Sequence, residues 1–295
     1  TIVPSFFSPF CGPVFQMVED SRGALLSLTF DPKALAIHIE AEMQTGSPTA
    51  KLLKTFSTGT LASLGRMPKG QMLYGGWQSN AQILNLFGSL IKDLGGENPA
   101  INKGLQELSK AGPGEHAFSM NLPTSGGQAW EFGSHAQARA AMHRMVTNMS
   151  KDGLFKMMPL KNGIKVKEKA ATHQKVDFCS VQMSWDLKKM IAQMFPPGAP
   201  VPDQVLDNIL KVYQQVLGES ITVWFGVKDK RLIVVADKDW NTAKEKLDQS
   251  LSDKSVGTTE AFKEVRKHLP EKSTMMGIVD LESYVEVALG MIKRV

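Results

Sequence analysis

The sequence has little of what marks membrane spans, redox centres and structural metal sites. None of its hydrophobic runs reaches the 18 residues that a spanning helix needs. Its two cysteines, Cys11 and Cys179, lie outside any C-x-x-C, which excludes a thioredoxin-like motif and a zinc knuckle. They would pair in an exported protein and stay reduced in a cytosolic one, so the pairing stays open.

The local signatures of common enzymes are also missing. No H-E-x-x-H, G-x-S-x-G or G-x-G-x-x-G occurs, and residues 59–65 lack the lysine of a phosphate-binding loop. His135 and His143 share a predicted helix, but eight residues separate them, which is too far for one ion. We therefore predict no catalytic residue, no cofactor-binding residue and no bound metal. Residues distant in sequence can still meet in space, so this prediction needs the fold.

One strand does carry metal-binding residue types at alternate positions, namely His38, Glu40 and Glu42. Alternate spacing places them on one face of the strand, where they could hold a metal. The polar face of a half-buried strand explains the same residues, because Ile37 and Ile39 fill the other face. We expect the three polar residues to face solvent.

The net charge of +5 is spread along the chain, with its densest lysine run between residues 161 and 175. A nucleic-acid site needs basic residues gathered with stacking aromatics, and here the aromatics lie elsewhere. We expect a solvated loop or hairpin instead. Sixteen methionines are the other unusual feature. They fill irregular cores, but they also line adaptable grooves, so a protein partner or an apolar ligand stays open.

Hairpin, turn and helix signals divide the chain into an N-terminal segment and three units. The hairpin in residues 24–43 resembles the one in residues 221–236, and Met67-Pro68 resembles Leu269-Pro270. The predicted divisions are residues 1–23, unit 1 in 24–112, unit 2 with a connecting helix in 113–218, and unit 3 in 219–295. Residues 24–94 and 219–295 should superpose as β-β-α-β-α units, with Leu35 matching Leu232 and Pro68 matching Pro270. Residues 115–195 should follow the same plan, with an insertion near 151–172.

The predicted fold class is α+β, with antiparallel sheets, helices packed on one face and two or three repeated units. Asp237 or Asp239 is expected to cap the first helix of unit 3 and Asp280 the last one, and a helix is expected over residues 78–94. The positions expected in the core are Ile37, Ile39, Leu73, Val223, Phe225, Ile233, Val235, Ile278, Leu281, Val285 and Leu289.

The order of hairpin, capped helix, L-P, strand, D-L and helix resembles a group of large exported bacterial proteins of uncharacterised function. The matching residues are 227–232, 237–239, 269–270 and 280–281. In the first unit Gln78 stands in place of the aspartate cap and Met67 in place of the leucine. The resemblance implies an envelope or extracellular location and carries over no catalytic residue. The chain begins with Thr1, which fits both a removed signal peptide and a trimmed chain.

Two functions follow from these observations. The first is a non-enzymatic, exported binding or scaffolding protein that works through a sheet face or an apolar groove. The second is a hydrolase whose site is assembled only in the fold. A deep polar pocket with converging His, Asp or Glu would favour the hydrolase. The sequence leaves the ligand and the oligomeric state open.

Overall fold

The computed structural model describes most of the chain. The described residues are 15–31, 34–79, 99–110, 114–121, 126–131, 135–152, 159–192, 195, 202–229, 231–252 and 254–292. They form a mixed α+β fold with antiparallel sheets, which confirms the predicted class. In this part of the chain no helix is both long and apolar enough to cross a membrane.

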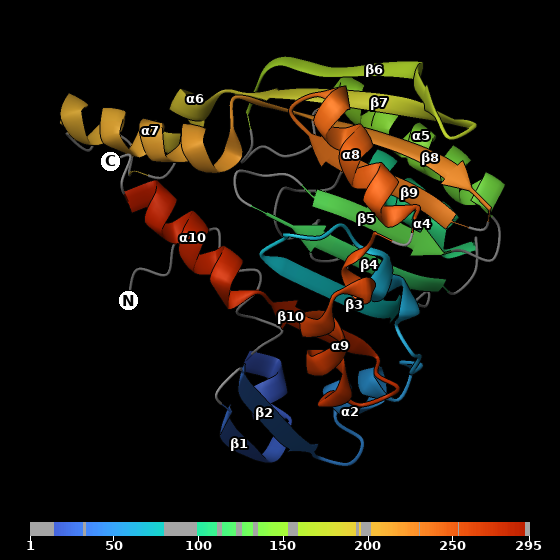
Figure 1. Cartoon of the computed structure of the whole chain (residues 1–295), viewed down its shortest axis with the longest axis vertical. Helices are drawn as coiled ribbons and strands as arrows, with labels where there is room; N and C mark the ends of the chain where they lie inside the picture. The colour runs from blue at the N-terminus through green and yellow to red at the C-terminus, as the bar shows by residue number, and fades with distance from the viewer. Residues whose placement is uncertain are drawn as a thin grey trace.

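The centre of the fold is an eight-stranded sheet in which every neighbouring pair is antiparallel (Figure 1). Its order is β10 (Met275–Val279), β3 (Leu73–Ser79), β4 (Gly114–Met120), β5 (Gly126–Glu131), β9 (Arg231–Asp237), β8 (Ser220–Lys228), β7 (Val176–Trp185) and β6 (Leu160–His173). Strands of all three predicted units therefore meet in one sheet. β10 and β6 are its two edges.

Helices cover both faces of this sheet, which corrects the expectation of a single covered face. Leu232 and Val234 of β9 belong to the core that includes residues of α4 (Pro99–Lys110) and α5 (His135–Asp152). Ile233 and Val235 point the other way, into a core with α8 (Trp240–Ser250). Because β9 is apolar at successive positions, it buries both faces, and each face needs its own helical cover.

The half of the α8 face that lies over β10, β3 and β4 is covered by short helices. These are η1 (Ala62–Arg66), η2 (Val256–Thr258) and α9 (Glu260–Lys267). Leu64, Tyr74 and Met276 meet in the core beneath them. Gly257 lies against the backbone of Gly65, where an added Cβ would come within 2.5 Å of the Gly65 carbonyl oxygen.

The remaining elements lie at the periphery of the fold. α6 (Leu187–Ala192) and α7 (Asp203–Leu217) pack around Trp185, whereas α2 (Pro48–Leu53) begins at the Ser47 cap. β1 (Ser21–Asp31) and β2 (Ala34–Met43) form a separate two-stranded sheet. α10 (Leu281–Ile292) follows β10 and leads away from the sheet (Figure 1).

The internal repeat is not confirmed. The first hairpin, β1–β2, stands in its own sheet, whereas its expected counterpart, β8–β9, lies inside the large sheet. Pro68 is fully buried and Pro270 is exposed, so the two prolines occupy different environments. Residues 151–172, expected as an insertion, contain most of strand β6. Leu35 is in β2, but its side chain is not among the described residues. Of the helix expected over 78–94, only Gln78 and Ser79 are described, and they end strand β3.

The core prediction is confirmed in the sheet and wrong in the last helix. Phe225, Ile233 and Val235 are buried, and Leu73, Val223 and Ile278 are half-buried. Leu281, Val285 and Leu289 are instead 58%, 49% and 49% exposed, because α10 does not lie on the sheet. Glu42 is exposed as expected; the side chains of residues 37–40 lie outside the described part. Asp239 and Asp280 cap α8 and α10 through bonds from the Thr242 and Ser283 amides.

Candidate functional site

Histidine and carboxylate pairs are the first feature to consider, because the hydrolase hypothesis requires one in a cleft. His173 Nε2 lies 2.6 Å from Asp248 Oδ1. Two other pairs, His143 with Glu168 at 3.1 Å and His268 with Glu264 at 3.6 Å, have strongly exposed carboxylates. The sequence did not reveal the His173 pair, because 75 residues separate its partners. Among the described residues, no three His, Cys, Asp or Glu side chains gather as metal ligands.

The His173–Asp248 pair belongs to a chain of contacts that ties the β6–β7 turn to α8. Gln174 donates to Asp248 Oδ1 at 2.7 Å, and Lys228 donates to Gln174 at 2.7 Å. The His173 ring meets Trp240 edge-on, with the ring centroids 6.3 Å apart. Partial burial raises the pKa of Asp248, but the hydrogen bonds from His173 and Gln174 outweigh it and leave the pKa below the ordinary value. Among the described residues, no hydroxyl or thiol group that could act as a nucleophile is hydrogen-bonded to this pair. The pair instead attaches the β6–β7 turn to α8.

Cys179 has the chemistry of a structural residue. Its side chain is free and buried in the core beneath α5. Burial raises its pKa to about 11, so the group is a thiol at neutral pH. Because the thiolate is the reactive form, Cys179 is a poor nucleophile. Cys11 lies outside the described residues.

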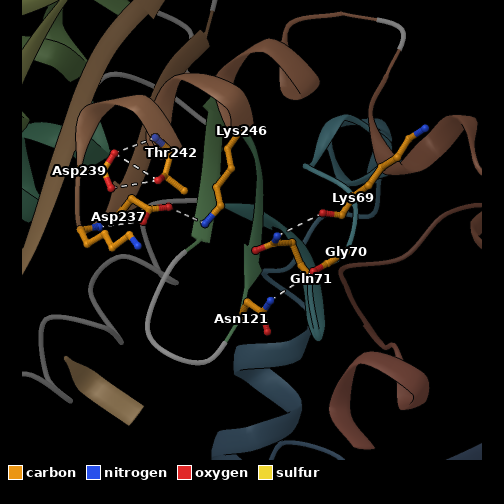
Figure 2. Close-up of polar contacts among 9 residues, drawn as sticks. Lys69, Gly70, Gln71, Asn121, Asp237, Asp239, Thr242 and Lys246 are labelled. Carbon is orange, nitrogen blue, oxygen red and sulfur yellow. Dashed lines mark hydrogen bonds and ion pairs between the residues drawn. The ribbon is translucent and has the colours of Figure 1, made fainter. Parts of the chain in front are cut away.

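A buried ion pair lies where β9 ends beside α8. Lys246 Nζ contacts Asp237 Oδ2 at 2.7 Å, with the two side chains only 13% and 5% exposed. The Lys238 amide donates to Asp237 Oδ1, so both carboxylate oxygens are bonded. Figure 2 shows Lys246 reaching from α8 to Asp237, next to the Asp239 cap.

The loop before β3 lies across from this pair (Figure 2). Gln71 Nε2 donates to the Lys69 carbonyl, and Asn121 Nδ2 donates to the Gly70 carbonyl. Gln71 Oε1 is buried and accepts no hydrogen bond from the described residues. The nearby hollow, lined by Arg66 and Lys246 among others, has room for about one water molecule. The ion pair joins β9 to α8, and the Lys69 amide joins the loop to the same helix by donating to Gln249 Oε1 at 2.9 Å. The hollow is too small for an organic substrate.

The open edge of β10 offers a larger surface. The Gln78 amide donates to the Thr274 carbonyl, and the Asp280 amide donates to the Met72 carbonyl. In an antiparallel ladder these bonds direct the backbone groups of Met276 and Ile278 toward β3. The N–H and C=O groups of Met275, Gly277 and Val279 therefore point outward. No described residue forms a backbone hydrogen bond with these outward groups.

Apolar side chains continue from this edge onto the next helix. Met275 is 66% exposed and Val279 52% exposed, both on the side of the sheet that carries Trp77. α10 begins two residues after β10 ends and presents a stripe at helical spacing. We call the whole the β10–α10 surface; it comprises Met275, Gly277, Val279, Leu281, Tyr284, Val285 and Leu289.

The opposite edge of the sheet is built differently. β6 carries exposed lysines, and its pairing with β7 shifts register twice, between Leu160/Ile164 and between Lys167/Ala171. Gly163 and Lys169 have positive φ angles of 68° and 47°, which breaks the regular strand. Charges and bulges are how proteins prevent edge strands from pairing with other chains. β10 has neither, so only one of the two edges is protected.

Sequence reasoning missed this surface because it assigned Leu281, Val285 and Leu289 to the core. One signal was present: residues 273–279 contain no charge and no proline, unlike the lysine-rich β6. Comparison with known proteins adds nothing further, since no family model, curated protein or solved structure matches the chain.

Proposed function

We propose that this chain is a non-enzymatic binding or scaffolding protein that takes a protein partner through the β10–α10 surface. The observation that carries the proposal is the contrast between the two sheet edges. β6 is protected by lysines and bulges, while β10 is uncharged and has three residues whose outward backbone groups bond to no described part of the chain. An extended segment can add to such an edge, with main-chain hydrogen bonds for affinity and side-chain contacts for specificity.

The exposed apolar area is large enough for a specific contact. Met275 and Val279 would form cross-strand contacts with side chains of an added strand on the same face of the sheet, and the stripe on α10 would receive apolar side chains from the same partner. The six apolar residues with side chains are 49–66% exposed, and counting each at about 200 Å², within the 150–250 Å² of an aromatic side chain, gives at most roughly 600 Å². A standard interface buries about 800 Å² on each partner, so the area of this surface is close to that of the smaller, transient interfaces.

The hydrolase alternative receives no comparable support from the described residues. The His173–Asp248 pair is part of a surface link, and the hollow beside Asp237 is too small for a substrate. The exported or envelope location remains part of the proposal and rests on the sequence resemblance alone. Fractionation of the source cells with an antibody against this chain would test that location.

A labelled β-strand peptide tests the binding surface directly. The probe is a fluorescein-labelled peptide of residues 273–281, and the readout is fluorescence anisotropy. We expect saturable binding that Val279→Lys weakens at least tenfold, because a lysine on an edge strand opposes pairing. The matched control is Val205→Lys on α7, where the valine is 43% exposed, and this variant should bind as the wild type does.

The proposal is wrong if extended peptides fail to bind and hydrogen exchange finds the amides of Met275, Gly277 and Val279 protected in a dilute monomer. In that case another part of the same chain covers the edge. Equal binding by the Val279→Lys variant would also contradict it, because the peptide would then be bound elsewhere.

A further inference from the structure

We propose that the occupant of the β10–α10 surface is β10 of a second copy, paired antiparallel about a twofold axis at Gly277. The inference rests on the proposed function, since it names the partner for the same edge. The two eight-stranded sheets would join into one continuous sheet. An isologous contact of this kind closes after two copies and leaves no further open edge of this type.

One register opposes all three outward-facing residues, whereas a shift by two residues opposes only two of them. With the axis at Gly277, Met275 lies opposite the second copy's Val279, and Gly277 lies opposite its own counterpart. All of these residues have outward N–H and C=O groups, so each opposed pair can exchange two hydrogen bonds. The contact would thus contain about six main-chain bonds. A shift by one residue would instead oppose the groups that are already bonded to β3.

The side chains fit the same register. Met275 and the second copy's Val279 would form a cross-strand apolar pair on the face that each now exposes at 66% and 52%. Gly277 brings no side chain to the axis, and a Cβ added there meets only the Tyr74 carbonyl oxygen, at 4.0 Å. Asp280 would lie opposite Thr274, so no like charges face each other across the contact.

The size of the contact argues for a reversible dimer. Burial of all the exposed apolar area, roughly 600 Å² on each copy with the α10 stripe included, would reach only the low end of the 1,200–2,000 Å² found for specific interfaces. A second copy is the partner that matches this strand without any further chain, because the same uncharged residues meet on both sides. We therefore expect a dimer that dissociates on dilution, at the micromolar, weak end of the range found for standard-sized interfaces.

Cysteine cross-linking tests the register. In a Cys11→Ser background, Gly277→Cys should form a disulfide-linked dimer under mild oxidation, because opposed hydrogen-bonded residues have Cα atoms about 5.5 Å apart. Met275→Cys alone should not cross-link, since its counterpart lies two pairs away. A mixture of the Met275→Cys and Val279→Cys proteins should give the mixed dimer. Cys179 is buried and stays in place throughout.

Sedimentation equilibrium of the full chain tests the dimer itself. The wild type and Val205→Lys should dimerise alike, and Val279→Lys should raise the dissociation constant at least tenfold, with unchanged circular dichroism. The inference fails if the wild type is a monomer up to about 100 µM, a concentration well above a micromolar constant. It also fails if a dimer persists in Val279→Lys and neither cysteine test cross-links, because the dimer then uses another surface. Binding of the strand peptide by a monomeric wild type would refute this inference and leave the proposed function standing.

Discussion

Acidification should destabilise this protein through one buried histidine, His116. Its side chain lies on β4 with 2% exposure, and its ring stacks on Trp77 at 5.0 Å between centroids. Burial disfavours the charged imidazolium and lowers the pKa of His116 from its ordinary value of 6.5 to about 4. In the unfolded chain the same group would titrate near its ordinary value of about 6.5.

The sign and the size follow from the difference between these two values. Above about pH 6.5 the histidine is neutral in both states, so its titration does not change the stability. Between about pH 6.5 and 4 the unfolded chain binds a proton that the folded protein does not, so the free energy of unfolding decreases as the pH is lowered. One pKa unit corresponds to about 1.4 kcal/mol, so lowering the pH from 7.5 to 4.5 should cost about 2–3 kcal/mol through His116 alone.

The assay is urea denaturation of the wild type and of His116→Phe at pH 7.5 and pH 4.5. Phenylalanine cannot titrate and can keep the stacking on Trp77, while the other histidines and the carboxylates are common to both proteins. The wild type should lose about 2–3 kcal/mol more than the variant on acidification. Equal losses in the two proteins would refute the reasoning, as would an imidazole pKa for His116 close to 6.5 in an NMR titration.

Two further predictions concern packing and buried charge. Lys246→Met should lower the free energy of unfolding, measured by urea denaturation, by about 3–5 kcal/mol, because it leaves the buried Asp237 without its partner at 2.7 Å. Adding Asp237→Asn should restore most of this loss. A smaller loss in the single variant would contradict this view. Gly257→Ala should lower the free energy of unfolding by about 1–3 kcal/mol, because the added Cβ would collide with the Gly65 backbone. The control Gly23→Ala, with nothing within 4 Å of the added Cβ, should be nearly neutral. Equal melting temperatures of the two variants would contradict the close contact.

Local features of the fold could be predicted because they depend on residues close in sequence. Asp280 was identified as a helix cap from its own side chain and the helix that follows, and the α8 cap was narrowed to Asp237 or Asp239, of which the structure shows Asp239. The apolar runs of β8 and β9 predicted a hairpin, and these strands do pair directly with each other. Burial of Phe225, Ile233 and Val235 follows from those runs as well.

Strand order could not be predicted, because it depends on contacts between distant segments. β3 lies between β10 and β4, although about 200 residues separate β3 from β10 along the chain. The two hairpins look alike in sequence, but only β8–β9 enters the large sheet. The likeness reflects shared hairpin chemistry, namely apolar strands around a polar turn, and this chemistry does not specify the neighbouring strand.

The binding surface was missed for a related reason. An apolar stripe at helical spacing, such as Leu281, Val285 and Leu289, shows that a helix gains free energy when that face is covered. It does not show whether the cover is the chain's own sheet or another molecule. The structure separates the two cases, because it leaves the stripe and the adjoining edge of β10 exposed together. A face that looks like core in sequence and stays exposed in the fold is therefore where a partner is best sought.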